Sequence, residues 1–250
     1  MQDRSKWLEK CLQWKTKWNS YQIESDDSDG INFYSIVEAI NLNLKENDVL
    51  LTDAGTAFYI IGQAAKITNG ARLILPGAQA DMGFSLPASI GIGMANENYN
   101  PIVLTGDGSF QTNIQELATI KANNIKTKIV IINNFGYLSI RNTQSKYYNN
   151  NVYGSTLDTG LWFPSLSKIA DTYEIDYCKI ETNEQMTESF SNLLHSDNCI
   201  LFDVHCKFSQ EVVPSVALKP MPDNTMKQCG LDDMAPFLSD DEYASEIRIS

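Results

Sequence analysis

Short apolar runs alternate with amphipathic segments along most of this chain. The apolar runs have the length of buried strands, and they cover residues 49–52, 72–75, 101–105, 128–132, 175–180 and 199–204. Helical periodicity fills the gaps between them, at residues 31–44, 57–66, 84–96, 112–123 and 183–194. Strands that alternate with helices predict a parallel sheet covered on both faces. We therefore expect an α/β fold with three layers, α/β/α, around a mainly parallel sheet of about six strands.

The two ends of the chain have a different pattern. Residues 3–18 mix charges with large apolar side chains, which favours an amphipathic helix. Acidic residues gather near the C-terminus, and we interpret that segment as a solvated tail. The pattern thus predicts three parts: a linker-like helix in residues 1–20, a main α/β domain in residues 21–210 and an acidic tail in residues 211–250.

Composition narrows the class of protein. The chain has 250 residues, 43% of them hydrophobic, and a net charge of −12. The negative charge argues against nucleic acid or an anionic membrane as a partner. No apolar run approaches the length of a membrane-spanning helix, and the polar start does not resemble a signal peptide. The five cysteines form no C-x-x-C pair, so we expect reduced thiols and a cytoplasmic location.

Two polar clusters follow two of the predicted strands. Gly106-Asp107-Gly108-Ser109-Phe110 comes directly after the run at residues 101–105, and Asn133-Asn134 closes the run at residues 128–132. A single crossover helix separates them, so both clusters would lie at the carboxyl edge of a parallel sheet. Ligands of open α/β sheets bind at that edge.

The residue types in these clusters suit magnesium and a diphosphate. Magnesium prefers oxygen ligands and keeps coordination positions for phosphate and water. Asp107 would supply a carboxylate oxygen, Asn134 a side-chain carbonyl, and Gly136 a backbone carbonyl. Gly106 and Gly108 let the backbone approach a phosphate closely. Ser109 opens a helix, whose free N–H groups attract anions.

A third strand-to-helix junction reads Asp53-Ala54-Gly55-Thr56. Gly55 and Thr56 would offer N–H groups and a hydroxyl to the far side of the diphosphate. Asp53 is a candidate cofactor-binding residue; the alternative is that it is a helix N-cap, and the two roles are compatible.

Five segments, in this order, resemble the diphosphate-binding domain of thiamine diphosphate enzymes in the acetolactate synthase and 2-keto-acid decarboxylase superfamily. The segments are Asp53–Thr56, Met82–Gly91, Gly106–Phe110, Gln115–Thr119 and Asn133–Tyr137. The resemblance extends from about the first helix to near the C-terminus. It implies thiamine diphosphate and Mg²⁺ as cofactors, with FAD possible only on a middle domain that this sequence lacks.

The resemblance also assigns roles to single residues. Met82 would be the apolar wedge that bends the cofactor, although a core methionine near a helix start is the alternative. The backbone carbonyl of Ala80 would accept a hydrogen bond from the cofactor's amine. Glu116 is interpreted as structural rather than as a general base. Thr143 stands where acetolactate synthases usually carry a tryptophan, which leaves the acceptor substrate open. Separately, the sequence pattern of residues 137–160 predicts a long, lid-like loop.

The expected reaction is decarboxylation of a pyruvate-like 2-keto acid, with carboligation to a second carbonyl, either as in acetolactate synthase or to a sugar ketone. In such enzymes the activating glutamate lies on a separate pyrimidine-binding domain, and we identify no catalytic residue of this kind here. The chain is thus expected to be one half of a split enzyme or the C-terminal portion of a longer one, inactive alone and part of a homo- or hetero-oligomer. A 2-keto-acid decarboxylase with two subunit types and a non-catalytic cofactor-binding subunit are the alternatives.

Overall fold

A computed structural model describes residues 4–18, 27–221, 223 and 225–247 of the chain. It divides into two compact units: one is Ile23–Gln210, and the other combines Met1–Gln22 with Glu211–Ser250. Each unit is described by itself below.

The larger unit is built on a six-stranded sheet in which every pair of neighbouring strands is parallel. Its order is β2-β1-β3-β4-β6-β5. The strands are β1 (Asp48–Thr52), β2 (Arg72–Ile74), β3 (Asn100–Gly106), β4 (Lys128–Asn133), β5 (Asp176–Ile180) and β6 (Ile200–His205). Every one of them overlaps a run that the apolar pattern predicts.

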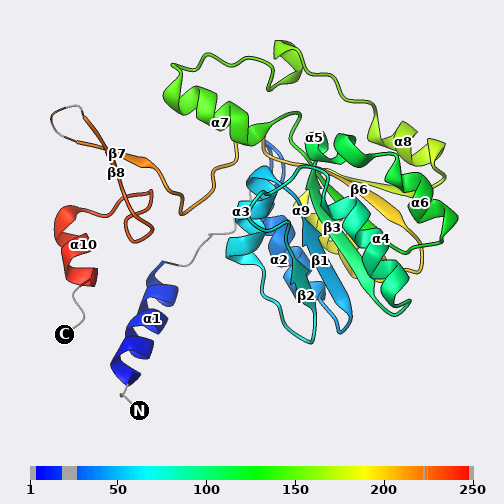
Figure 1. Cartoon of the computed structure of the whole chain (residues 1–250), viewed down its shortest axis with the longest axis horizontal. Coiled ribbons are helices and arrows are strands. Elements are labelled where there is room, and N and C mark those ends of the chain that lie inside the picture. The colour runs from blue at the N-terminus through cyan, green and yellow to red at the C-terminus, as the bar shows by residue number, and fades with distance from the viewer. Residues whose placement is uncertain (1–3, 19–26, 222, 224, 248–250) are drawn as a thin grey trace. The chain divides into compact units, whose positions relative to one another are not determined.

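Helices cover both faces of the sheet (Figure 1). One face packs against α4 (Ser85–Ala95), α6 (Glu116–Ala122) and α8 (Leu166–Thr172), and the other lies against α2 (Phe33–Asn43), α3 (Gly55–Ala64) and α9 (Asn183–Leu193). Successive side chains of a strand point to opposite faces of the sheet. Because helices cover both faces, both sets of side chains are buried in the central strands. Val49 and Leu51 of β1 join the core under α4, while Leu50 between them is equally buried. This arrangement confirms the predicted three-layer α/β/α fold.

The strand order reverses between β1 and β3. After β1 the chain crosses to β2 at one edge, and it then returns to place β3 on the other side of β1. Such a switch point leaves a crevice at the carboxyl ends of the two strands, because their connections leave in opposite directions. Asp53 directly follows β1, and Asp107 directly follows β3.

Two segments differ from the sequence-based expectations. Residues 137–160 are not one long loop, because α7 (Leu138–Tyr147) and the short 3₁₀ helix η2 (Leu157–Thr159) form within them. The helix predicted at residues 112–123 is shorter than expected: α6 begins only at Glu116, and it is preceded by the short helices α5 (Asp107–Phe110) and η1 (Gln111–Asn113). The pattern misses α7 because its sequence is mostly polar and it buries only Leu138 and Arg141.

The smaller unit joins the two ends of the chain. It contains α1 (Ser5–Lys17), the antiparallel pair β7 (Leu218–Pro220) and β8 (Met226–Gln228), and α10 (Asp240–Ile247). Glu246 of α10 accepts hydrogen bonds from Lys10 Nζ at 2.6 Å and from Trp14 Nε1 at 2.8 Å. The segment interpreted as a solvated acidic tail therefore holds secondary structure, and part of its negative charge is paired with α1.

Candidate functional site

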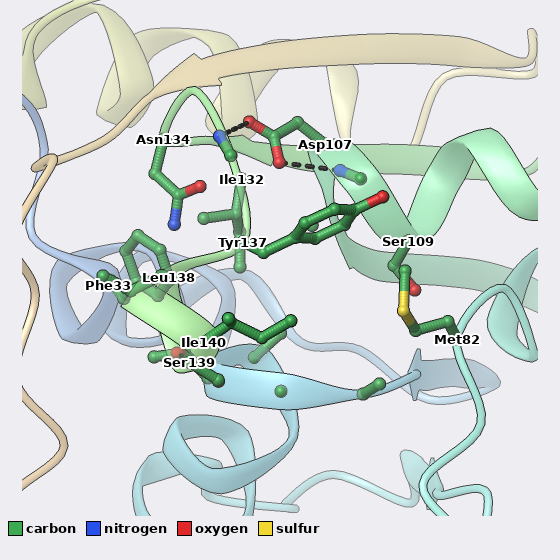
Figure 2. A pocket seen from close by; sticks show the side chains of 17 residues that line it. Phe33, Met82, Asp107, Ser109, Ile132, Asn134, Tyr137, Leu138, Ser139 and Ile140 are labelled. Atoms are coloured by element: carbon green, nitrogen blue, oxygen red, sulfur yellow. Dashed lines mark hydrogen bonds between the residues drawn. The ribbon is translucent and has the colours of Figure 1, made fainter. Parts of the chain in front are cut away.

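A cavity of about 130 Å³ opens at the carboxyl edge of the sheet (Figure 2). All the residues predicted to bind cofactor or metal line it except Asp53 and Ala80. The lining consists of Phe33, Ala54, Gly55, Thr56, Ala57, Met82, Gly106, Asp107, Gly108, Ser109, Ile132, Asn134, Gly136, Tyr137, Leu138, Ser139 and Ile140. The ends of β1, β3 and β4 thus bring three separate sequence motifs to one place.

Asp107 is the only carboxylate among the residues that line this cavity. Its side chain is 4% exposed, and its two oxygens accept from Gly108 N at 2.7 Å and from Gly136 N at 3.0 Å. Burial raises the pKa of this carboxyl to about 6, although surrounding backbone N–H groups act in the opposite direction. Each carboxylate oxygen has a further lone pair, so Asp107 keeps capacity for a cation that would compensate its buried charge.

Asn134 and Arg141 each carry a buried polar atom without a partner. Asn134 Oδ1 accepts no hydrogen bond, and Arg141 Nη1 donates none. Such atoms are costly to bury unless a ligand or water satisfies them. Figure 2 shows the side chains of Asn134 and Asp107 beside the same cavity. An oxygen acceptor that awaits a partner is what a metal ligand at this position requires.

The two glycines that flank Asp107 differ in the space beside their Cα atoms. A Cβ on Gly108 would overlap the ring of Tyr137, so packing within the protein excludes any larger residue there. A Cβ on Gly106 would have nothing of the protein within 4 Å, and its φ of −76° suits any residue. Gly106 lines the cavity, so the open space beside it is available to a ligand.

Asp53 lies behind the cavity rather than in its wall. One of its oxygens, Oδ2, accepts from Thr105 Oγ1 at 2.6 Å and from Ser109 Oγ at 2.8 Å. Burial raises the pKa of this carboxyl, while nearby hydroxyls and Gly83 N–H lower it. The N-cap of α3 is Ala54, without a side-chain bond, so the interpretation of Asp53 as a helix N-cap is wrong. Its observed contacts join the ends of β1 and β3.

Met82 and Ala80 behave differently although they are neighbours. Met82 is 42% exposed and lines the cavity, so it is not the core methionine that was the alternative interpretation. Ala80 has a left-handed backbone with φ of 49° and does not line the cavity. Glu116 accepts from Thr119 Oγ1 at 3.1 Å within its own helix and is likewise absent from the lining, which fits a structural residue.

Part of the cavity wall, most of it apolar, lies outside the predicted site. Phe33 comes from the start of α2, and Tyr137, Leu138, Ser139 and Ile140 come from the start of α7. The Tyr137 ring lies across the cavity between Asp107 and Ile140 (Figure 2). Leu138, Ser139 and Ile140 were not predicted because α7 was taken for loop, and Phe33 lies far from the motifs in sequence; Tyr137 was marked only as the last residue of the segment Asn133–Tyr137.

A second cavity of about 510 Å³ shares only Asp107 with the predicted site. Phe135, Phe163, Tyr177 and Asp203 are among its lining residues. Asp203 already accepts from Asn133 Nδ2 at 2.9 Å and from Tyr177 Oη at 2.7 Å. The smaller cavity is the better candidate for the cofactor, because the three strand-end motifs meet there.

The donor set of the first cavity fits a hard cation and a diphosphate. It offers one carboxylate, one amide oxygen without a partner and glycine backbone, and such oxygen ligands are those of magnesium. No group of three or more His, Cys, Asp and Glu residues that could hold a metal occurs within the described ranges. The candidate site does not need one, because it combines a single carboxylate with amide and backbone oxygens.

Comparison with known proteins places this geometry in context. Residues 53–204 match the family model described as thiamine pyrophosphate enzyme, C-terminal TPP binding domain. Thiamine pyrophosphate is another name for thiamine diphosphate. The match begins at Asp53, directly after β1, and ends inside β6, so it covers the other five strands of the sheet and every motif that lines the cavity.

Several acetolactate synthases are similar to the chain. The large subunit of isozyme 1 from Escherichia coli strain K12 is 27% identical over 188 residues, which are 75% of this chain and 33% of that protein. The large subunit from Lactococcus lactis strain IL1403 is 30% identical over 168 residues, or 67% and 28% of the two chains. The mitochondrial catalytic subunit from Aspergillus candidus is 26% identical over 244 residues, or 96% and 33%. The chain thus spans about a third of the length of these relatives. In the described part of the chain, no helix has the length and apolar character needed to cross a membrane.

Proposed function

This chain belongs to the thiamine pyrophosphate enzymes, whose C-terminal cofactor-binding domain it contains, and from that membership we propose that it binds the diphosphate of thiamine diphosphate through Mg²⁺. The observation that carries the proposal is the convergence of Asp107, Asn134 and Gly136 on one cavity beside the open space at Gly106. The whole protein would then act as a decarboxylating enzyme of the acetolactate synthase type.

Three oxygen atoms of this chain would hold the metal. Asp107 would give a carboxylate oxygen, Asn134 its unpartnered Oδ1, and Gly136 its backbone carbonyl. Magnesium keeps its remaining coordination positions for water and phosphate, which leaves room for the diphosphate. The metal would compensate the negative charge of the Asp107 carboxylate, whose pKa is raised by burial.

Glycine and hydroxyl groups would surround the diphosphate. Gly106, Gly108 and Ser109 would do so at the end of β3, and Gly55 and Thr56 at the start of α3, on the other side of the switch point. Ser109 Oγ also accepts from Gly83 N at 2.9 Å, so the residue directly after Met82 is tied to the segment Gly106–Phe110. That tie holds Met82 at the mouth of the cavity, where it would support the bent form of the cofactor. We retain the proposed backbone contact at Ala80, although this residue does not line the cavity.

Substitution of Gly106 by alanine is expected to weaken cofactor binding without weakening the fold. The added methyl group meets no protein atom within 4 Å, but it occupies space that a phosphate would need. Overpacking of this kind costs about 1–3 kcal/mol, so affinity for thiamine diphosphate should fall roughly tenfold. Calorimetric titration measures the affinity, and urea denaturation measures the stability.

Gly62 of α3 offers a matched control for this substitution. A Cβ there also meets nothing within 4 Å, but Gly62 does not line the cavity. Gly62→Ala should bind the cofactor like the wild type. Equal affinity of Gly106→Ala and Gly62→Ala would contradict the placement of the diphosphate.

The size and surroundings of the cavity support a partner domain. Its volume of about 130 Å³ is below the 300–1,000 Å³ that is typical of ligand pockets. Helix α4 is almost wholly apolar, yet only Ser85, Leu86 and Ser89 of it are buried, and Met94 is 63% exposed. A helix that is apolar all round is normally covered. We propose that a pyrimidine-binding domain covers the exposed surface of α4. The same domain would complete the site and supply the activating glutamate, within a homo- or hetero-oligomer.

The proposed reaction is decarboxylation of a pyruvate-like 2-keto acid followed by addition to a second carbonyl. Bound thiamine diphosphate would supply the electron sink for this chemistry. The chain's own contribution would be to anchor the diphosphate, to set the cofactor's bend through Met82 and to exclude water with Phe33, Leu138 and Ile140. The donor and acceptor follow from likeness to acetolactate synthases, since no described residue selects them.

Release of carbon dioxide from pyruvate tests the partner requirement. We expect no turnover by this chain with thiamine diphosphate and Mg²⁺, and turnover after addition of a pyrimidine-domain protein encoded beside it. Full activity of the chain alone would contradict the need for a partner. Tight cofactor binding with no turnover in the complex would contradict the enzyme assignment and favour a non-catalytic cofactor-binding subunit.

We also propose a cytoplasmic location. Its support is that the five cysteines are free thiols, as expected in a reducing compartment.

A further inference from the structure

A short segment after α7 packs directly against the loop that carries Gly136. Tyr137 N donates to Ser155 O at 3.0 Å, and Gly136 forms an isolated antiparallel bridge with Thr156. Ser155 is fully buried. A Cβ on Gly136 would overlap the carbonyl oxygen of Ser155, so the two backbones are in close contact. Residues 153–156, the Ser155 segment, therefore fix the position of residues 134–137. We call residues 134–137 the metal loop, because they include the proposed metal ligands Asn134 and Gly136.

Gln144, on the second turn of α7, holds that segment with both ends of its side-chain amide. Its Oε1 accepts from Ser155 Oγ at 2.7 Å and from Tyr153 N at 3.4 Å, and its Nε2 donates to Tyr153 O at 2.9 Å. A second anchor lies beyond it, where Thr159 Oγ1 accepts from Ser155 N at 3.2 Å and from Thr156 N at 3.0 Å. The segment is thus attached to α7 on one side and to η2 on the other.

A continuous set of contacts leads from Gln144 to Asp107. Gln144 holds Ser155, the Ser155 backbone packs on Gly136, and Gly136 N donates to Asp107 Oδ2 at 3.0 Å. Gln144 does not line the cavity. Its hydrogen bonds connect it to the metal loop, which carries Gly136, through Ser155.

We propose that Gln144 is a positioning residue for the metal site: it sets where the carbonyl of Gly136 and the carboxylate of Asp107 stand by clamping Ser155. The inference rests on the proposed function, because it takes the metal ligands from there. It adds a residue outside the cavity that controls metal affinity rather than cofactor contact.

The test measures metal affinity and local backbone protection together. Mn²⁺ serves as the metal probe, and its binding to the full chain with thiamine diphosphate present is followed by electron paramagnetic resonance. Gln144→Ala is expected to weaken Mn²⁺ binding roughly tenfold, the lower end of the effect of losing an outer-sphere partner. Amide hydrogen exchange in residues 134–138 of the metal-free protein should become faster, because Tyr137 N loses its fixed acceptor.

A double-mutant cycle separates this clamp from a general loss of stability. Ser155→Ala removes the hydroxyl that donates to Gln144, so Gln144→Ala and the double variant should weaken Mn²⁺ binding by similar factors. Gln144→Glu keeps the acceptor for Ser155 and loses the donor to Tyr153, so its affinity should be intermediate. Ser145→Ala, at an exposed neighbour, is the control and should bind Mn²⁺ like the wild type.

Each outcome decides one claim. Weaker Mn²⁺ binding with an unchanged thermal midpoint and a non-additive cycle supports the clamp. Wild-type affinity in Gln144→Ala overturns it, as does a loss of affinity that only follows a loss of thermal stability. A wild-type chain that binds no Mn²⁺ with thiamine diphosphate overturns the proposed function instead, and hydrogen exchange then still shows whether Gln144 orders the loop.

Discussion

Replacement of Asp107 by alanine is expected to abolish magnesium-dependent binding of thiamine diphosphate. Asp107 is the one carboxylate among the lining residues, and no other acid stands there to take its place. Loss of an outer-sphere partner already costs 10–100-fold in metal affinity, so loss of a direct ligand should cost at least about 100-fold. Calorimetric titration of cofactor at saturating Mg²⁺ measures this loss.

Asp81 provides the matched control for this prediction. It is an exposed acid next to Met82, it does not line the cavity, and substitution by asparagine removes the same single charge. Asp81→Asn should bind like the wild type. If Asp107→Ala keeps its affinity while the control does too, Asp107 is not a metal ligand.

Substitution of Gly136 by alanine is expected to have the second largest effect, on both folding and binding. Gly136 has φ of +147°, and an added Cβ would overlap Ser155 O and lie 3.4 Å from Arg141 Nη1. Backbone strain and overpacking each cost about 1–3 kcal/mol, so the free energy of unfolding should fall by roughly 3 kcal/mol. The displaced loop should also lose most of its metal affinity.

Urea denaturation and Mn²⁺ titration check the two effects of Gly136→Ala separately. Gly62→Ala again serves as control, because alanine is favoured over glycine inside a helix by about 0.5–1 kcal/mol. That variant should be as stable as the wild type or slightly more so. A Gly136→Ala protein with unchanged stability would show that the close contact with Ser155 does not constrain the loop.

The central strands of the sheet could be predicted from sequence because they are short, buried on both faces and rich in apolar residues. Leu50 and Val130 are buried like their neighbours on the other face, which gives the uninterrupted runs that parallel strands require. Helix α7 could not be found in this way. It buries only Leu138 and Arg141, so it lacks the apolar stripe on which helix prediction depends.

The site was predictable where chemistry and spacing coincide. Asp107, Asn134 and Gly136 follow strand ends, and parallel strands bring their carboxyl ends to one edge. Asp53 shows the limit of that reasoning, because the same strand-end position places it behind the cavity, bonded to Thr105 and Ser109. Gln144 shows another limit, because its contact with Ser155 depends on the path of the chain between α7 and η2, which the residue pattern did not predict.

The central claim is that this chain holds the diphosphate through a metal at Asp107. Titration of thiamine diphosphate into the wild-type chain, once with Mg²⁺ and once with a chelator, tests it most directly. We expect saturable binding of one cofactor per chain with Mg²⁺ and at least about 100-fold weaker binding without it. Absence of binding in both conditions, also with the pyrimidine-domain partner present, would contradict it.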